Sequence, residues 1–572
     1  MSELVTEKRW SLKSLPEDEV VDRLAKEVNV RPELARLLLQ RGIKDYESAK
    51  AFFRPSLEDL HDPFLMKDMD KAVDRLSLAI SEGENIMVYG DYDVDGTTSV
   101  ALVYSFLKEH TDSIMYYIPD RYTEGYGLSA QGIDQAADND VSLIITLDCG
   151  IKAVEKVDYA KTKGIDIIIC DHHRPGDILP PAVAILDAKQ DGCEYPYKEL
   201  CGCGVGFKFM QAFSLRHDLD QNTLFDYLDL VATAIGADIV PITGENRVLM
   251  THGLNMVNTR PSGGIKALLQ VADVKKRLSV TDLVFIVAPR INAAGRIFHG
   301  NHAVALLTSE DLTHLEEVAK EVNTFNQERK ELDRAITEQA LDMISADEDQ
   351  RKAKTTVVYK EDWHKGVVGI VASRLTETYY RPTIVLTESN GMVTGSARSV
   401  RHFDVYDAID ACSDLLVNFG GHKYAAGLTM ELDNLSEFQK RFEEVVSSSI
   451  APELLIPEVI TDLYLELDHV DRKFYNVIKQ MAPFGPGNMR PVFRSGPCLG
   501  RYAKIVGDKH LKFQAYQEDA NRVLNCIAFN HSDKLELLNS GRSFDMLYSV
   551  EENEWNGMVS LQLNIKDIRP TD

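Results

Sequence analysis

Residues 86 to 99 read Ile-Met-Val-Tyr-Gly-Asp-Tyr-Asp-Val-Asp-Gly-Thr-Thr-Ser, a short apolar strand that runs directly into Asp91, Asp93 and Asp95. Carboxylates crowded at a strand end repel one another and resist the loss of water, so a divalent cation is the simplest compensation. A solvated acidic turn is the alternative. A calcium loop is disfavoured, because Leu102 stands at the twelfth position from Asp91, where such loops carry Glu.

The next predicted strands also lead to side chains that bind metals. The apolar run at 141 to 147 is followed by Asp148, and the run at 166 to 170 leads to His172 and His173. Because the carboxyl ends of parallel strands line one crevice in an open α/β sheet, we expect these groups to lie together. Carboxylates and imidazoles suit Mn²⁺ or Mg²⁺. The three strand ends together favour a metal site over a solvated turn.

Strand and helix patterns alternate through this part of the chain, which predicts an α/β fold with a doubly wound parallel sheet. Arg121 follows the second strand, where it either reads a phosphate or pairs with Asp120 at the surface. Asp238 lies in an apolar stretch, where an unpaired carboxylate is costly. It is a candidate for a further metal ligand, and a helix cap is the alternative.

The rest of the chain predicts further domains. Apolar spacing predicts one long helix from about 311 to 345 that links two lobes, and strand patterns restart near 353 in a second α/β domain. Glycine-rich segments at 395 to 399 and 419 to 427 are interpreted as turns that could grip a phosphodiester backbone. From 457 the chain is rich in strands, as in a five-stranded β-barrel of the OB type. The predicted domains are a helical N-terminal extension (1–70), a catalytic domain (71–310), a linking helix (311–350), a second α/β domain (351–453) and the OB-like barrel (454–572).

Bulk properties set limits on function. No apolar run reaches the length of a membrane span and no signal-like segment follows the N-terminus, so we expect a soluble, cytoplasmic protein. The eight scattered cysteines fit a reducing compartment, and the spacing of Cys201 and Cys203 is poor for zinc. A net charge of −26 argues against a polyanionic partner, although a local groove lined by Arg and Lys can still be positive.

Ordered motifs from residue 86 onward resemble the single-stranded-DNA-specific exonucleases of the DHH phosphoesterase superfamily. The motifs are GDYDVDG at 90–96, TLDCG at 146–150, DHH at 171–173, ADIVP at 237–241, PRINAAGR at 289–296, GVVGIVASRL at 366–375, GSARS at 395–399 and FGGHKYAAGL at 419–428. The resemblance implies a DHH catalytic domain, a DHH-associated domain that binds nucleic acid, and a C-terminal OB domain. One departure is Tyr89, which stands where related pyrophosphatase-type enzymes have a histidine ligand.

The resemblance also implies the roles of individual residues. Two Mn²⁺ or Mg²⁺ ions would be held by Asp93, Asp95, Asp148, His172 and Asp238, with Asp148 placed to bridge them. Asp91 would be an additional ligand or an acceptor behind the ligands. His173 would face the scissile phosphate, and Asp148 and His173 would be the catalytic pair. The DNA strand would be bound by Arg121, Arg290, Arg296, Ser396, Arg398 and His422.

The activity implied by the resemblance is 5′ to 3′ hydrolysis of single-stranded DNA by a two-metal mechanism, with release of 5′-mononucleotides, in recombination and repair. A phosphodiesterase acting on short oligonucleotides or cyclic dinucleotides is the alternative, and a noncatalytic nucleic-acid-binding scaffold is a third possibility. The expected partners are single-stranded DNA, a single-strand-binding protein and a helicase. We expect a monomer that does not contact membranes.

Overall fold

The first lobe is built on a sheet of five parallel strands. The computed structural model describes all residues except 1–6, 519, 556 and 572. The strand order is β3 (Ile114–Tyr117), β2 (Asn85–Gly90), β4 (Val141–Leu147), β5 (Asp166–Cys170) and β6 (Ala184–Leu186). The chain passes from β2 to β3 on one side and then continues at β4 on the other. A crevice is expected at this switch of direction, outside the carboxyl ends of β2 and β4.

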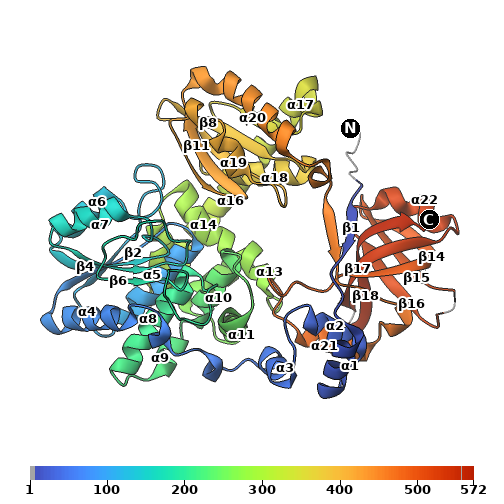
Figure 1. Ribbon diagram of the computed structural model, residues 1–572, viewed down its shortest axis with the longest axis horizontal. Coiled ribbons are helices and arrows are strands. Elements are labelled where there is room, and N and C mark those ends of the chain that lie inside the picture. The colour runs from blue at the N-terminus through green and yellow to red at the C-terminus, as the bar shows by residue number, and fades with distance from the viewer. Residues whose placement is uncertain (1–6, 519, 556, 572) are drawn as a thin grey trace.

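Helices cover both faces of this sheet, which confirms the prediction of a doubly wound α/β fold (Figure 1). Side chains alternate between faces along each strand. Ile86 and Val88 therefore pack with α4 (Met69–Glu82), α5 (Val94–Lys108) and α8 (Gly202–Arg216). Met87 and Tyr89 pack on the opposite face with α6 (Ala130–Asp138) and α7 (Val154–Thr162).

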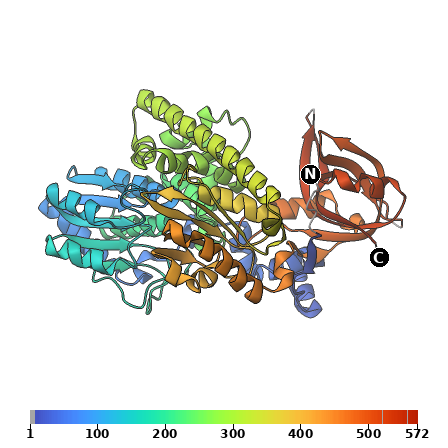
Figure 2. The ribbon, with the colours of Figure 1, turned by 90° about the horizontal axis from the view of Figure 1, so that it is seen from above.

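One long helix joins the first lobe to the second α/β domain, as predicted. α16 runs from Leu312 to Ala346 and begins at the cap Asp311, whose carboxylate accepts the backbone N–H of Thr313 at 2.8 Å. Its first half contributes apolar side chains to the core of the first lobe, and its second half packs in a separate core with α18 (Val368–Tyr379). Figure 2 shows the helix running from one lobe toward the other. Each end of α16 is therefore fixed in a packed core.

The second domain has a mixed sheet with the order β10-β11-β9-β8-β7. β7 (Thr356–Tyr359) is parallel to β8 (Thr383–Ser389), whereas β9 (Met392–Arg398), β11 (Ala425–Met430) and β10 (Asn418–His422) pair antiparallel. The glycine-rich segments at 395–399 and 419–427 are therefore mostly paired strands, and their interpretation as turns is wrong. Cross-strand pairing outweighs the weak strand propensity of glycine here.

The C-terminal region closes into a five-stranded β-barrel, as predicted. Its strands are β14 (Phe493–Val506), β15 (His510–Tyr516), β16 (Val523–Ala528), β18 (Met558–Pro570) and β17 (Phe544–Trp555), which pairs back to β14. The N-terminal helices α1 (Asp18–Glu27) and α2 (Pro32–Leu39) share one apolar core with this barrel, and β1 (Arg9–Leu12) pairs with β12 (Glu458–Thr461). The two ends of the chain thus form one lobe (Figure 1).

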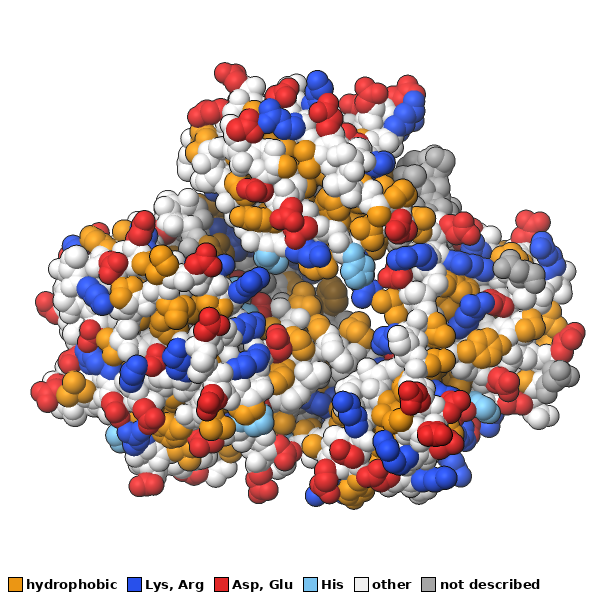
Figure 3. Space-filling model, in the orientation of Figure 1, with side chains coloured by type: hydrophobic (Ala, Val, Ile, Leu, Met, Phe, Trp, Pro, Cys, Tyr) orange, Lys and Arg blue, Asp and Glu red, His pale blue; other side chains and the backbone are white. Residues whose placement is uncertain are grey.

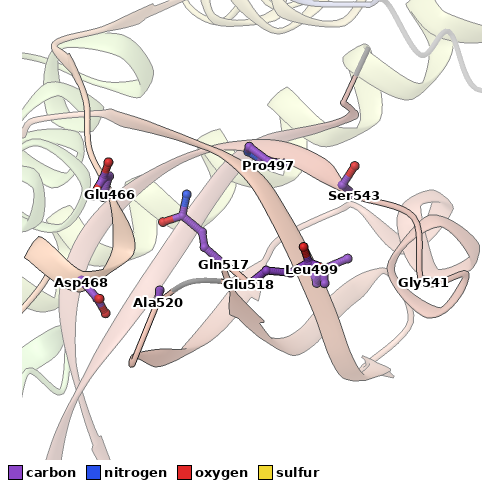
Figure 4. A pocket seen from close by; sticks show the side chains of 9 residues that line it. All are labelled: Glu466, Asp468, Pro497, Leu499, Gln517, Glu518, Ala520, Gly541 and Ser543. Carbon is purple, nitrogen blue, oxygen red and sulfur yellow. The ribbon is translucent and has the colours of Figure 1, made fainter.

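A pocket of about 520 Å³ opens on the barrel (Figure 4). Three carboxylates, those of Glu466, Asp468 and Glu518, line it together with Gln517 and Ser543. Because like charges repel, this part of the barrel disfavours a polyanion such as nucleic acid.

Within the described residues, none of the helices combines the length and the apolar character needed to cross a lipid bilayer.

Candidate metal centre and substrate site

Four of the predicted metal ligands meet at one point of the crevice. Nε2 of His172, which follows β5, lies 3.2 Å from Oδ1 of Asp148, which follows β4. The same nitrogen lies 3.6 Å from a carboxylate oxygen of Asp238 and 3.8 Å from one of Asp95. Asp95 lies in the first turn of α5, and Asp238 follows α10 (Leu228–Ala237). Residues far apart in the sequence therefore present four ligand groups to one space.

The N-terminus of α8 holds Asp95 in place. The backbone N–H groups of Gly202 and Cys203 donate to the Asp95 carboxylate at 2.6 and 2.7 Å. A helix N-terminus favours negative charge, so this arrangement suits a buried carboxylate. A side chain at Gly202 would place its Cβ 2.6 Å from that of Asp148, so only glycine fits. This supporting contact was not predicted, because the segment was considered only for zinc.

Burial and mutual repulsion make this cluster of carboxylates hard to ionise. Burial and the charge of Asp93 raise the pKa of Asp95 to about 7. Burial and the charges of Asp95 and Asp93 raise the pKa of Asp238 to about 8. The pKa of Asp148 is also raised, by burial and by Asp95. Burial and the neighbouring His173 lower the pKa of His172 to about 3, so this imidazole is neutral and able to bind a metal.

The donor set fits divalent cations. Oδ1 of Asp148, Oδ2 of Asp91 and both ring nitrogens of His172 are buried and have no hydrogen-bond partner among the described residues. Buried polar atoms are normally satisfied, so these atoms indicate a missing partner. Carboxylate oxygens with one imidazole match the ligand preferences of Mn²⁺ and Mg²⁺.

Three further residues of segment 86–99, Asp93, Asp91 and Tyr89, differ in their contacts. Asp93 caps α5 by accepting the N–H of Gly96 at 3.0 Å, and its charge acts on the pKa of each clustered aspartate. Asp91 is fully buried, and its pKa is raised by burial and by Asp93. The hydroxyl of Tyr89 donates to the backbone oxygen of Gly127 at 3.0 Å, so it is engaged in the fold.

His173 is held by a residue to which the sequence analysis gave no role. Asp171 accepts Nδ1 of His173 at 2.8 Å and also the backbone N–H groups of Ile151, His172 and His173. Burial alone would lower the pKa of His173, but the hydrogen bond and the charge of Asp171 raise it to about 9. The side chain of His173 is 44% exposed, against 9% for His172. His173 therefore faces the open part of the crevice as a cation.

Three of the predicted DNA-binding arginines lie close to one another. Arg398 on β9 donates to Oγ of Ser396 at 2.7 Å, and Arg121 lies 4.0 Å over the ring of Tyr92. Burial, together with the charges of Arg121 and Arg398, lowers the pKa of Arg296 to about 9. These arginines are partly buried, and none of them forms an ion pair with a carboxylate among the described residues. Such guanidinium groups are suited to a phosphate. We call Arg121, Ser396 and Arg398 the terminal-phosphate group, after the role that the resemblance in sequence predicts for them.

The two remaining predicted DNA-binding residues differ. His422 lies exposed at the end of β10, where partial burial and the charges of His173 and Arg398 lower its pKa. The guanidinium of Arg290 is instead engaged within the fold. It donates to Asn323 of α16 at 3.0 Å and to the backbone oxygen of Ile286 at 2.6 Å. The PRINAAGR segment at 289–296 can also be interpreted as a helix N-terminus with a packing role, and Arg290 fits that interpretation.

A basic pocket of about 800 Å³ lies next to the metal ligands. It extends from Ala237, the neighbour of Asp238, to the linking helix α16. On the face seen in Figure 3, Lys and Arg side chains also lie around the central hollow between the lobes. The cationic lining residues are Arg296, Arg329, Lys330, Arg334 and Arg374. The basic residues of α16 were not predicted to form a site, because a helical face of alternating charge resembles any solvated surface.

Comparisons with known protein families agree with this architecture. Residues 85–235 match the DHH family, N-terminal domain, and residues 352–448 match the DHHA1 domain. Residues 461–567 match the RecJ OB domain. The fold and the aspartate and histidine cluster thus define a protein of the DHH class.

The full chain also matches characterised relatives. It is 38% identical over 571 residues to the single-stranded-DNA-specific exonuclease RecJ of Bacillus subtilis (strain 168), covering 99% of this chain and 71% of that protein. It is 37% identical to RecJ of Salmonella typhimurium, covering 94% and 96%. The chain belongs to the RecJ family. The crystal structure of RecJ in complex with Mn²⁺ from Thermus thermophilus superposes with a TM-score of 0.85 at 27% identity, covering 99% of this chain and 80% of that one.

Proposed function

We propose that this protein is an exonuclease that hydrolyses single-stranded DNA from the 5′ end and releases 5′-mononucleotides with the help of two Mn²⁺ or Mg²⁺ ions. The observation that carries the proposal is the convergence of Asp95, Asp148, His172 and Asp238, at 3.2 to 3.8 Å from one imidazole nitrogen, in a chain of the RecJ family. The RecJ proteins of Bacillus subtilis and Salmonella typhimurium, to which the chain is 38% and 37% identical, are named single-stranded-DNA-specific exonucleases.

The metal ions would be held by Asp93, Asp95, Asp148, His172 and Asp238, with Asp91 supporting them from behind. Bound ions supply Lewis-acid activation of water and neutralise charge on the phosphate. Asp148 is the central residue of the set, because its carboxylate lies next to His172 and its pKa responds to Asp95, Asp93 and Asp238. The backbone N–H groups of α8 keep Asp95 oriented without a side chain that could move.

His173 would act on the scissile phosphate. Its Nδ1 is bound to Asp171, so Nε2 is the nitrogen available to the substrate. With a pKa raised to about 9, the imidazole carries a proton at neutral pH and can donate a hydrogen bond to a phosphate oxygen. The hydroxyl of Tyr126 lies 3.4 Å from Nε2 and donates to the backbone oxygen of Asp148 at 3.0 Å, which limits the space open to this ring.

The terminal-phosphate group would set the direction of digestion. Arg121, Ser396 and Arg398 would bind the 5′-phosphate of the strand, with His422 beside them. Arg296 and the basic pocket along α16 would then hold the following nucleotides. A positively charged groove that tracks the backbone is the usual way in which single strands are bound without sequence preference.

A DHH phosphodiesterase of short oligonucleotides remains the second candidate, because the terminal-phosphate group and the metal ligands would serve a short substrate equally well. The basic pocket of about 800 Å³ and the closed barrel favour the longer strand. Chain length therefore decides between the two functions.

The function is tested by incubating the purified protein with Mn²⁺ and with single- or double-stranded DNA labelled at either end. We expect a 5′-phosphorylated single strand of 30 or more nucleotides to yield labelled mononucleotide from its 5′ end first, with duplex and 3′-first digestion much slower. Preference for dinucleotides or trinucleotides over the long strand would instead identify the oligonucleotide enzyme.

Replacing Arg398 with alanine should weaken the binding of 5′-phosphorylated single strands by about 10- to 100-fold, because one charge-assisted contact to the terminal phosphate is lost. The slope of log K against log salt should fall by about one unit. Arg441→Ala is the matched control, since Arg441 pairs with Asp414 in the same domain at 2.6 Å. An effect confined to turnover would contradict the phosphate role.

The cellular setting is also a proposal. We propose that the enzyme works as a monomer in the cytoplasm, in recombination and repair, on strands delivered by a helicase and covered by a single-strand-binding protein. All eight cysteines are free, which supports a reducing compartment.

A further inference from the structure

The first lobe and the second α/β domain meet beside the active site through four residues. Nη1 of Arg296 donates to the backbone oxygen of Gly366 at 3.0 Å. The hydroxyl of Tyr122 donates to the backbone oxygen of Arg296, and its ring meets the ring of His364 edge-on, with centroids 6.2 Å apart. Tyr122 and Arg296 belong to the first lobe, and His364 and Gly366 to the second domain. We call these four residues the interdomain joint.

The interdomain joint leaves no space for a side chain at Gly366. A Cβ added at Gly366 would lie 2.5 Å from the hydroxyl oxygen of Tyr122 and 2.6 Å from the backbone oxygen of Arg296. Real Cβ atoms do not approach other heavy atoms this closely, so even a methyl group would push the two domains apart locally. The backbone N–H of Gly366 also donates to Nδ1 of His364 at 3.2 Å, which fixes the loop from the other side.

In the second domain, a residue close to the joint contacts two members of the terminal-phosphate group. Gly369 stands three residues after Gly366, in the first turn of α18. A Cβ at Gly369 would lie 3.1 Å from Nη2 of Arg398 and 3.2 Å from Oγ of Ser396. The first turn of α18, which directly follows the joint, therefore packs closely against the two side chains expected to hold the 5′-phosphate.

On the side of the first lobe, the joint leads to the metal ligands. A Cβ at Gly295, the neighbour of Arg296, would lie 2.6 Å from the backbone oxygen of Tyr92. Tyr92 stands between Asp91 and Asp93, and its ring lies under Arg121, the neighbour of Tyr122. A continuous series of contacts thus connects the metal ligands of the first lobe with Ser396 and Arg398 of the second domain.

We propose that the interdomain joint fixes the separation between the metal centre and the second-domain members of the terminal-phosphate group, Ser396 and Arg398, so that a bound 5′-phosphate places the first phosphodiester bond at the metals. Tyr122 and Gly366 are then positioning residues, which touch neither metal nor phosphate. The inference rests on the proposed function, because it requires a strand held by its 5′-phosphate. Spacing matters here because a misplacement of about 1 Å can lower a catalysed rate by about 10²-fold.

The test uses Tyr122→Phe, which removes one hydroxyl, and Gly366→Ala, which forces the joint open. Tyr159→Phe is the matched control, since the Tyr159 hydroxyl donates to Asp134 on the outer helices, at 2.6 Å. Each protein is given single strands that carry either a 5′-phosphate or a 5′-hydroxyl. Turnover is measured with Mn²⁺, and Kd is measured in a metal chelator.

In the wild-type protein the 5′-phosphate should raise kcat and tighten binding. In Gly366→Ala the gain in kcat should fall at least about tenfold, and in Tyr122→Phe by a smaller factor. The 5′-phosphate would still bind, but the first phosphodiester bond would no longer lie at the metal centre. The gain in affinity should change by less than about twofold, since the terminal-phosphate group is intact. Tyr159→Phe should keep both gains.

Three results would overturn the inference. The first is an unchanged 5′-phosphate gain in kcat in both variants, and the second is an equal loss of kcat on both substrates. The third is a loss of both the gain in kcat and the gain in affinity. The first leaves the joint without a role in turnover, the second indicates damage to the metal centre, and the third places the effect in phosphate binding. The proposed function itself would be contradicted if the wild-type protein and the Tyr159→Phe control showed no 5′-phosphate gain or released no mononucleotide. Failure of the further inference alone would leave the wild-type and control results as expected.

Discussion

Replacing Asp148 with alanine is expected to abolish hydrolysis, with kcat lowered by at least about 10³-fold, while the binding of single-stranded DNA survives. Asp148 is 2% exposed and lies 3.2 Å from His172, at the centre of the four converging ligands. Residues that act as one catalytic unit lose nearly the whole effect when one member is removed. The strand contacts of the terminal-phosphate group and the basic pocket do not include Asp148.

Stability gives a second measurement of the same substitution. Adding Mn²⁺ to chelator-treated wild-type protein should raise Tm by several degrees, because a ligand at 100 times its Kd contributes about 2.7 kcal/mol. Asp148→Ala should lose this metal-dependent gain. In the metal-free variant the loss of a buried carboxylate from a repelling cluster opposes the strain of alanine at a φ of 60°, so Tm without metal should stay close to that of metal-free wild type. Asp138→Ala, at an exposed position of α6, is the control. Continued DNA degradation by Asp148→Ala in Mn²⁺ buffer would refute the two-metal proposal.

The convergence of the candidate metal ligands was largely predictable, because three of the four follow strands. Asp95, Asp148 and His172 come shortly after β2, β4 and β5, and the rule that parallel strands share one ligand-binding edge places them together without any knowledge of side-chain packing. Asp238 is different, since it follows a helix and not a strand of this sheet. Its apolar surroundings suggested a costly carboxylate, but only the packing of α10 brings it to His172.

Features that depend on pairing between distant segments were not predictable. The glycine-rich segments near Gly395 and Gly420 carry turn residues, yet β9, β10 and β11 pair with one another and determine the local structure. The packing role of Arg290 and the support of Asp95 by α8 involve partners 33 and 107 residues away. Local sequence carries no signal for such contacts, because the same residue types occur on ordinary surfaces.

Asp171 is the residue whose role emerged only from the structure, and replacing it with asparagine should lower kcat by about 10²- to 10³-fold. Its carboxylate accepts four hydrogen bonds, one from Nδ1 of His173 at 2.8 Å and three from backbone N–H groups. An asparagine side chain can accept with only one of its two terminal atoms, so part of this set is lost. A comparable Asp to Asn change beside a catalytic imidazole elsewhere costs about 10⁴-fold through the wrong tautomer.

If Asp171 acts through His173, the effects of the two residues cannot add. The double variant Asp171→Asn/His173→Ala should be no slower than His173→Ala alone, whereas independent roles would multiply the losses. KM for single-stranded DNA and the Mn²⁺-dependent gain in Tm should stay close to wild type in Asp171→Asn, because His172 and the clustered aspartates remain in place. Asp134→Asn, which alters an acceptor on the outer helices, should leave kcat unchanged. Additive losses in the double variant, or a missing gain in Tm in Asp171→Asn, would show that Asp171 supports the metal ligands themselves and not the orientation of His173.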